Sequence, residues 1–144
     1  MRLTMRTNLA MRTLMFCAVN PDRIVRRQDV AAACNASENH LAQVIHHLAQ
    51  KKFLHTIRGR AGGLMLGRAP ETITVGEVFL AFEAPLPYTE CFAAADNSCP
   101  LVAACRLKCL LSDALAAFYA KLDAVSIADL VKGNADLHTI LQVA

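Results

Sequence analysis

The stretch VAAACNASENHLAQVIHHLAQKKFLHTIRGRAGGLMLGR, residues 30–68, decides the fold. Its first residues end a short helical segment, RQDVAAAC, and a brief turn at Asn35-Ala36 leads to a second one. Ser37 is suited to cap the second helix, with Glu38 in its first turn. The apolar positions of this segment form one stripe at helical spacing, namely Leu41, Val44, Ile45 and Leu48. Two helices joined by so short a turn predict a helix-turn-helix.

A β-hairpin is predicted directly after this pair. The runs FLHTIR (53–58) and LMLG (64–67) read as strands, and the glycine-rich GRAGG joins them. A hairpin in this position is a wing, with Arg58 and Arg60 at its tip, where they could enter a minor groove or clamp phosphate. The sequence therefore predicts a mainly α protein with a winged helix-turn-helix.

In that motif the second helix lies in the major groove, with its first exposed residues at the base edges. Amides such as those of Asn39 and Gln43 can read adenine, and the neighbouring His46 and His47 are expected to face DNA or solvent. The alternative is that these residues are only the wet face of an amphipathic helix. The predicted base-reading residues are Ser37, Glu38, Asn39, His40 and Gln43, and the predicted phosphate contacts are Arg2, Arg26, Arg27, Lys51 and Lys52.

Charge divides the chain into two unlike parts. Residues 1–68 hold eleven lysines and arginines against three acids, whereas residues 69–144 hold four against nine. A basic half joined to an acidic half suggests that the first meets a polyanion. We therefore expect a DNA-binding domain over 1–68 and a second segment, 69–144, with another task.

The second segment contains a long helix with a packing seam. Helical patterns cover residues 74–83, capped by Thr74, and 105–125, and Ser126 begins a tail with two short amphipathic pieces. In the long helix the apolar residues are spaced alternately by four and three, at Leu111, Leu115, Phe118, Leu122 and Val125. Such a seam predicts a dimerisation helix that pairs with its own copy, and packing against its own chain is the alternative. Helix-turn-helix proteins bind as dimers to palindromic half-sites, which fits a homodimer on double-stranded DNA.

Four of the six cysteines fall between residues 91 and 109. The N-terminus shows no secretory signal and no run approaches a membrane span, so we expect a cytoplasmic protein without a membrane partner. Thiols stay reduced there, which favours metal or redox chemistry over disulfides. A zinc site is an alternative, although the close CxxC pairs typical of zinc are missing. Cys17 and Cys34 lie on apolar helix faces and read as inert buried thiols.

The combination of motifs resembles the IscR-like family of bacterial iron–sulfur winged-helix transcription regulators, and most closely its nitric-oxide-sensing repressors. The matching pieces are the opening MRLT, the helix-turn-helix and wing of residues 30–68, the segment CP…ACRLK and the closing SIADLV. The resemblance implies a homodimer that binds a palindromic operator, with one [4Fe-4S] or [2Fe-2S] cluster in each subunit. It also implies that nitric oxide attacks the cluster and relieves repression.

The resemblance places the cluster ligands on Cys91, Cys99 and Cys105, in a loop spanning about residues 88–109. In the nitric-oxide-sensing branch an aspartate near the start of the partner's first helix completes the site, and the matching residue here is Asn8. An amide is a poorer iron ligand than a carboxylate. Cys109, one helical turn beyond Cys105, is the substitute, and an open fourth position is the other possibility.

Other functions remain as alternatives. One is an IscR-like regulator that responds to iron–sulfur status, and another is a winged-helix regulator that senses redox state through its thiols. An enzyme is not expected, because no nucleophile, base and acid are grouped in the sequence: Ser112 and His138 stand alone, and Gly62-Gly63 belongs to the wing.

Overall fold

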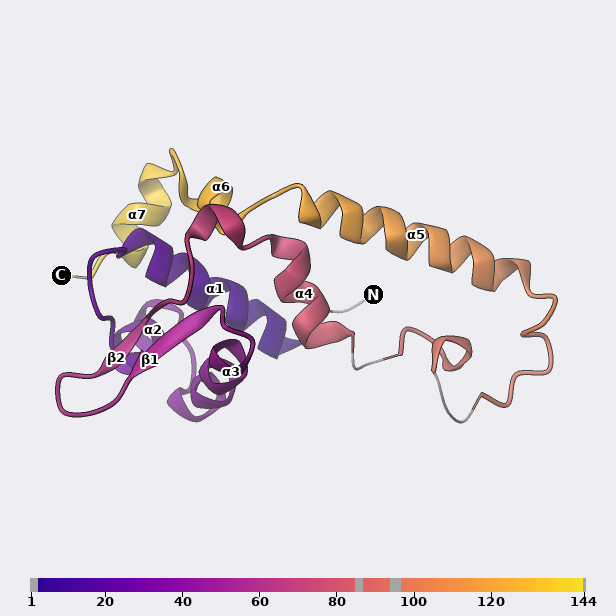
Figure 1. Ribbon diagram of the computed structural model, residues 1–144, viewed down its shortest axis with the longest axis horizontal. Coiled ribbons are helices and arrows are strands. Elements are labelled where there is room, and N and C mark those ends of the chain that lie inside the picture. Colours follow the sequence, from indigo (N-terminus) through magenta and orange to yellow (C-terminus); the bar gives the residue numbers. More distant parts are fainter. Residues whose placement is uncertain (1–2, 85–86, 94–96, 144) are drawn as a thin grey trace.

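The structure is a computed structural model that describes residues 3–84, 87–93 and 97–143. Figure 1 shows the first three helices and the hairpin gathered at one end, with α5 running away from them and α4 lying between. This is a winged helix-turn-helix followed by a long helix, and it confirms the predicted fold class. The elements are α1 (Met5–Val19), α2 (Arg27–Ala33), α3 (Glu38–Gln50), β1 (Leu54–Ile57), β2 (Gly63–Leu66), η1 (Pro70–Thr72), α4 (Val75–Glu83), η2 (Glu90–Phe92), α5 (Arg106–Asp123), α6 (Ile127–Val131) and α7 (Ala135–Leu141).

Helix α1 forms the centre of the molecule, where it contacts α3, α4, α6 and α7. The Thr4 hydroxyl caps its N-terminus by accepting from the Thr7 N–H at 3.2 Å, so the helix begins at Met5. Asn20 ends it, directly before Pro21. Four residues that repeat at helical spacing along it are buried: Leu9, Thr13, Phe16 and Cys17.

The helix-turn-helix is made by α2 and α3. Asn35 adopts a left-handed backbone with φ of 48°, a conformation that asparagine tolerates better than most residues. This residue lets the chain reverse within a few positions. The whole predicted stripe of α3 is buried, namely Leu41, Val44, Ile45 and Leu48, so the opposite face of α3 is left at the surface.

The wing is an antiparallel hairpin in which Leu54 lies opposite Leu66 and Ile57 opposite Gly63. The predicted second strand therefore begins one residue earlier, at Gly63. A Cβ on Gly62 would lie 2.1 Å from the Ile57 carbonyl oxygen, so the turn requires glycine there. Val25 and Leu64 exchange backbone hydrogen bonds of 3.0 and 2.8 Å, which join the wing to the segment before α2.

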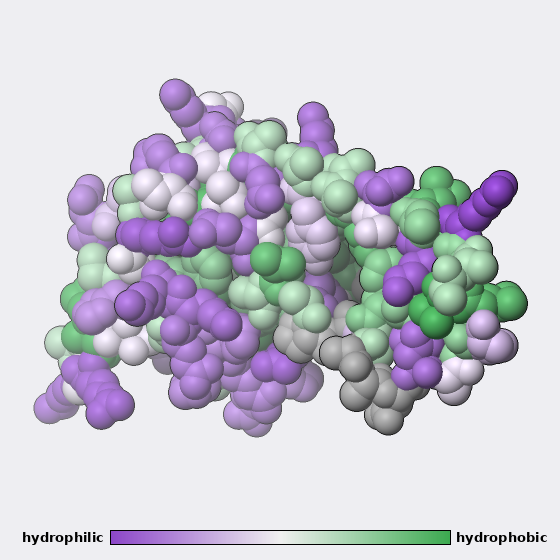
Figure 2. Space-filling view, turned by 45° about the vertical axis from the view of Figure 1, so that its right-hand side comes forward, coloured by the Kyte–Doolittle hydropathy of each residue, from purple (hydrophilic) through white to green (hydrophobic). Residues whose placement is uncertain are grey.

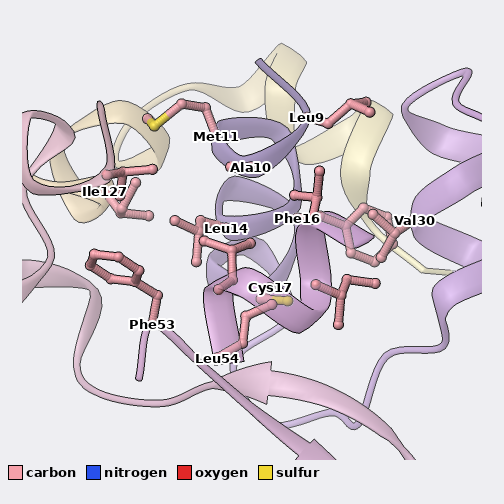
Figure 3. Close-up of a cluster of buried hydrophobic side chains, with 14 of the residues drawn as sticks. Leu9, Ala10, Met11, Leu14, Phe16, Cys17, Val30, Phe53, Leu54 and Ile127 are labelled. Atoms are coloured by element: carbon pink, nitrogen blue, oxygen red, sulfur yellow. The ribbon is translucent and has the colours of Figure 1, made fainter. Parts of the chain in front are cut away.

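One hydrophobic core includes side chains from both halves of the chain. Figure 3 shows Phe16 of α1 on the side of Val30 of α2, and Leu14 of α1 on the side of Phe53 and of Ile127, which comes from α6 in the second half of the chain. Ile73 and Val78 belong to the same core. The predicted DNA-binding part, residues 1–68, and the rest of the chain share this core. The division at residue 68 therefore stays a prediction about which part of the chain binds DNA.

Helix α5 has no buried residue. At its C-terminal end, half-buried Phe118 and Leu122 pack against the core, and the Phe118 ring lies 6.2 Å from that of Phe79 in α4. Towards its N-terminus, Leu107 and Leu110 are 60% and 64% exposed. The C-terminal half of the predicted seam therefore packs on its own chain, which was the alternative, while the other end projects from the core.

Candidate functional site

The predicted base-reading residues lie together on the outer surface of α3. All five are exposed: Ser37, Glu38, Asn39, His40 and Gln43. Ser37 occupies the N-cap position, although its side chain makes no cap hydrogen bond. Glu38 forms an exposed ion pair with Arg27 of α2, with Nη2 and Oε2 3.1 Å apart. That exposed ion pair links α2 to α3 only weakly. The side chains of Asn39 and Gln43 are exposed beside it.

The wing adds positive charge on one side of α3. Arg58 and Arg60 are exposed on either side of Gly59, whose φ of 107° shapes the turn. A hollow between α2, α3 and the wing is lined by Arg26, Arg27, His46, Arg60 and Gly62, among others. Figure 2 shows hydrophilic side chains gathered over this end of the molecule. The arrangement is suited to phosphate groups along one strand of a duplex.

Two lysines follow α3 at the surface. Lys51 caps the C-terminus of α3 and Lys52 has a left-handed φ of 61°, and both are exposed. Arg2, the remaining predicted phosphate contact, lies outside the described residues. These positions agree with phosphate contact, which stays a prediction for each of them.

A second polar hollow lies on α3, and its lining includes residues that sequence reasoning missed. Arg6 of α1 lines it beside Gln43, His46 and Gln50 of α3. The helical spacing of Gln43, His46 and Gln50 could have identified their shared face. Nothing in the sequence pattern indicated Arg6, because its position depends on how α1 packs against α3.

His47 does not face DNA or solvent as predicted. Its ring is half-buried, its Nε2 lies 3.0 Å from the Ala81 carbonyl oxygen, and it packs edge-on against Phe82 with ring centroids 4.6 Å apart. Since a carbonyl only accepts, Nε2 donates this hydrogen bond. His46 is exposed as expected, but His47 joins α3 to α4.

The cysteine loop, residues 88–109, follows α4 and ends within α5. Cys91 lies in η2, Cys99 in the irregular part and Cys105 at the N-cap of α5, and each is half-buried. The Cys91 Sγ is 3.0 Å from Thr89 Oγ1, and the Cys99 N–H donates to Asn97 Oδ1 at 3.1 Å. Over residues 3–84, 87–93 and 97–143, no three His, Cys, Asp or Glu side chains are gathered closely enough to hold a metal ion.

The donor set of this loop still suits an iron–sulfur cluster in its chemistry. Thiolates are the preferred ligands of such clusters, and three half-buried thiols on one loop are accessible to an incoming metal. The structure places these thiols on one segment without bringing them together. The predicted ligand roles of Cys91, Cys99 and Cys105 therefore stay predictions.

The two candidates for a fourth ligand lie on different helices. Cys109 is exposed in α5, one turn beyond Cys105. Asn8 is exposed on α1 and lines a groove with Met11, Lys121 and Leu122, and no cysteine in the described part of the chain lines that groove. Within one chain Asn8 is thus separate from the cysteine loop, so a ligand role for it would require the partner subunit.

Cys17 and Cys34 are buried, as predicted. Burial raises the pKa of Cys17 to about 12, and the neighbouring Cys34 adds to the effect. Burial also raises the pKa of Cys34, against the opposing charge of Arg12. Both thiols remain protonated at neutral pH and are poorly suited to bind metal.

A family model matches most of the chain. The model is that of Rrf2, described as an iron-dependent transcriptional regulator, and it covers residues 3–133. In the described ranges, no helix is long and apolar enough to cross a membrane.

Relatives and solved structures agree with this match. The chain is 40% identical to the HTH-type transcriptional regulator NsrR of Geobacillus kaustophilus, over 99% of this chain and 97% of the relative. It is 39% identical to the regulator of the same name from Bacillus subtilis, over 99% of both chains. IscR of T. potens has the same fold, with a TM-score of 0.72 at 20% identity, over 100% of this chain and 93% of that chain.

Proposed function

Because the chain belongs to the Rrf2 family of transcriptional regulators, we propose that it is a homodimeric repressor whose iron–sulfur cluster senses nitric oxide. As a member of that family it is a regulator of transcription and not an enzyme. The observation that supports the proposal best is the order of its parts. An exposed recognition helix and an arginine-tipped wing are followed, along one chain, by a thiol-rich loop that ends on a long helix.

Operator binding is assigned to α3 and the wing. The buried stripe of α3 holds the helix against α1 and α2, so its outer face can enter the major groove. Asn39 and Gln43 would read base edges, since their amides donate and accept at once. Arg58 and Arg60 would bind phosphate or the minor groove, and Lys51 and Lys52 would add attraction that does not depend on sequence.

Dimerisation is assigned to the N-terminal half of α5. Leu107 and Leu110 are exposed there, and Leu101 is exposed in the segment before the helix. Figure 2 shows hydrophobic side chains gathered at that end of the molecule. A second copy would remove these side chains from water and set the distance between two recognition helices. A palindromic operator is the matching DNA target.

Cluster binding is assigned to Cys91, Cys99 and Cys105. When bound, the cluster would supply iron for reaction with nitric oxide, and that reaction would relieve repression. The protein's own contribution is to hold three thiols on a loop that begins after α4 and reaches the N-cap of α5. Cys105 occupies the N-cap position of α5, at the positive end of the helix dipole.

The direct test is anaerobic purification, followed by visible absorption and native mass spectrometry during stepwise addition of nitric oxide. We expect one cluster per subunit, and its mass distinguishes [2Fe-2S] from [4Fe-4S]. The cluster-loaded protein should bind the operator about 5–150-fold more tightly than the cluster-free protein, a usual range for coupled sites. Cys99→Ala should behave as cluster-free, and Ser98→Ala, an exposed neighbour, should behave as wild type.

The outcomes separate this proposal from its alternatives. Equal operator affinity for loaded, cluster-free and Cys99→Ala protein contradicts it. A cluster that resists nitric oxide favours a regulator of iron–sulfur status, and a protein without iron that forms disulfides favours thiol redox sensing. Repeating the mass measurement with Asn8→Asp and Cys109→Ala assigns the fourth ligand.

A further inference from the structure

The last turn of α4 lies between the cysteine loop and the recognition helix α3. We call Ala81, Phe82 and Glu83 the α4 end turn. It is the final part of α4 before the chain enters the cysteine loop. Ala81 and Phe82 contact α3, and Glu83 contacts α1 and lies beside the cysteine loop. These contacts together give the turn a role that its sequence does not suggest.

The first contact joins the α4 end turn to the recognition helix. The last carbonyls of a helix lack a donor from their own helix, and here His47 of α3 donates to the Ala81 carbonyl at 3.0 Å. The same ring packs edge-on against buried Phe82. His47 follows Gln43 by one helical turn, so the side chain that caps α4 belongs to the helix that would read the bases.

The second contact joins the α4 end turn to α1. Glu83 Oε1 accepts from the Thr4 N–H at 3.0 Å and from the Thr4 hydroxyl at 2.9 Å, and it also accepts from the Thr7 hydroxyl. Burial alone would raise the pKa of Glu83, but the hydrogen bonds from Thr7 and Thr4 outweigh it and hold that pKa below its ordinary value. An ionised carboxylate therefore lies at the N-terminus of α1, where the helix dipole favours negative charge.

The third contact is with the cysteine loop itself. A hollow beside Glu83 is lined by Tyr88 and Phe92 of the loop and by Phe118 and Tyr119 of α5. Phe92 is the residue after Cys91, and its ring meets that of Tyr88 at 6.3 Å. The α4 end turn thus contacts α1 and the recognition helix α3 on one side and the hollow beside the cysteine loop on the other.

We propose that the α4 end turn couples the cysteine loop to the recognition helix, with His47 as the positioning residue and Glu83 as a second connection through α1. This inference rests on the proposed function, since it requires a loop whose state alters operator binding. The His47 bond is already 3.0 Å long, so a shift of the turn by more than about 0.5 Å would either break it or move α3. A rearranged loop would therefore change the placement of α3.

The test measures operator affinity with and without the cluster and compares the ratio among variants. His47→Leu removes the donor and keeps an apolar side chain, and His47→Gln keeps a donor of similar reach. We expect the wild-type ratio of about 5–150 to fall towards one in His47→Leu and to be largely retained in His47→Gln. The control is His46→Leu, the exposed neighbour. It can alter both affinities through DNA contact but should leave their ratio unchanged.

A wild-type ratio retained in His47→Leu overturns the inference while leaving the proposed function intact. A ratio of one in the wild type overturns the proposed function, and the inference falls with it. Hydrogen exchange on the wild-type protein gives a reading that needs no variant. Cluster removal should alter amide protection in the α4 end turn and in the part of α3 around His47. Changes confined to the cysteine loop would contradict the coupling even if every variant folds poorly.

Discussion

At the scale of single residues, burial divides the six cysteines into two groups. Cys17 and Cys34 lie in the core, where desolvation keeps their thiols protonated. Cys91, Cys99 and Cys105 are half-buried and Cys109 is exposed. Reactivity of a cysteine depends on the thiolate and on access to it, so only the second group is suited to metal or signal chemistry. The protein therefore keeps buried and accessible thiols in separate environments.

The carboxylate of Glu83 gives a prediction for the pH dependence of stability. Its pKa in the folded protein is below the ordinary value of 4.5. A group with a lowered folded-state pKa stabilises the fold above the unfolded-state pKa, and this stabilisation is lost as the pH falls through the folded-state value. We therefore expect Glu83→Gln to be less stable than wild type near pH 7, and the difference to shrink below about pH 4.5.

The measurement is chemical denaturation of both proteins at a series of pH values. The matched control is Glu71→Gln, an exposed carboxylate in η1, which should show no such pH-dependent difference. A Glu83→Gln difference that is constant from neutral to acid pH would contradict the assignment of an ionised cap on α1.

At the scale of elements, two hollows flank α3, one beside the wing and one beside α1. A major groove is bordered by two phosphate strands, so a helix lying in it benefits from positive charge on both sides. Arg60 lines the hollow on one side and Arg6 the hollow on the other. The wing is rigid at its base, where Val25 and Leu64 exchange hydrogen bonds, and its tip presents the arginines.

The wing arginines should contribute to operator affinity through counterion release. Each phosphate contact lowers the slope of log K against log salt by about 0.9. The double variant Arg58→Ala/Arg60→Ala should therefore bind with a slope shallower by about 2, if each side chain contacts one phosphate. Titration of a labelled operator at several salt concentrations measures this slope.

Lys121→Ala is the control for the wing variant, because Lys121 is exposed on α5, away from the recognition surface. Its slope should equal that of wild type. An unchanged slope in the double variant would show that the wing does not contact phosphate, and the wing would then need another role.

At the scale of the whole molecule, the protein consists of one packed core and the N-terminal end of α5, which projects from that core. The core joins α1, α3, α4 and α6, so the DNA-binding surface and the α4 end turn form one packed unit. The N-terminal half of α5 extends beyond that unit with its leucines exposed. Exposed apolar side chains gathered in this way are typical of an interaction surface.

Charge placed on this apolar end should disrupt the proposed homodimer. Leu107→Asp/Leu110→Asp adds two negative charges at positions that are 60% and 64% exposed in the single chain. Neither change removes a core contact, so the subunit should fold, but burying those charges against a second copy would cost several kcal/mol. We expect a shift from dimer to monomer in sedimentation velocity and weaker binding to a two-half-site operator.

Ala120→Asp provides the control for this variant, since Ala120 is exposed in the C-terminal half of the same helix, outside the proposed interface. It should remain dimeric. Unchanged sedimentation of the double variant would place the subunit interface elsewhere.

The sequence by itself determined the local structure of this protein. The stripes of α1 and α3, the caps at Thr74 and Ser126 and the glycine-rich wing turn follow from helical spacing and from residues with particular backbone preferences. These signals act between residues only a few positions apart, so they can be read along the chain. The surface of α3 was predicted for the same reason, because burial of one face defines the other.

Only the tertiary structure decided which distant residues meet. His47 contacts Ala81, Glu83 caps α1 from 79 residues away, and Arg6 lies beside α3. The seam of α5 likewise had two possible partners, and the C-terminal half of the seam packs against the core of its own chain. Such contacts depend on the angles at which helices pack, which no local spacing encodes. The physical reason is that helical periodicity identifies the face that is buried, whereas packing decides what that face is buried against.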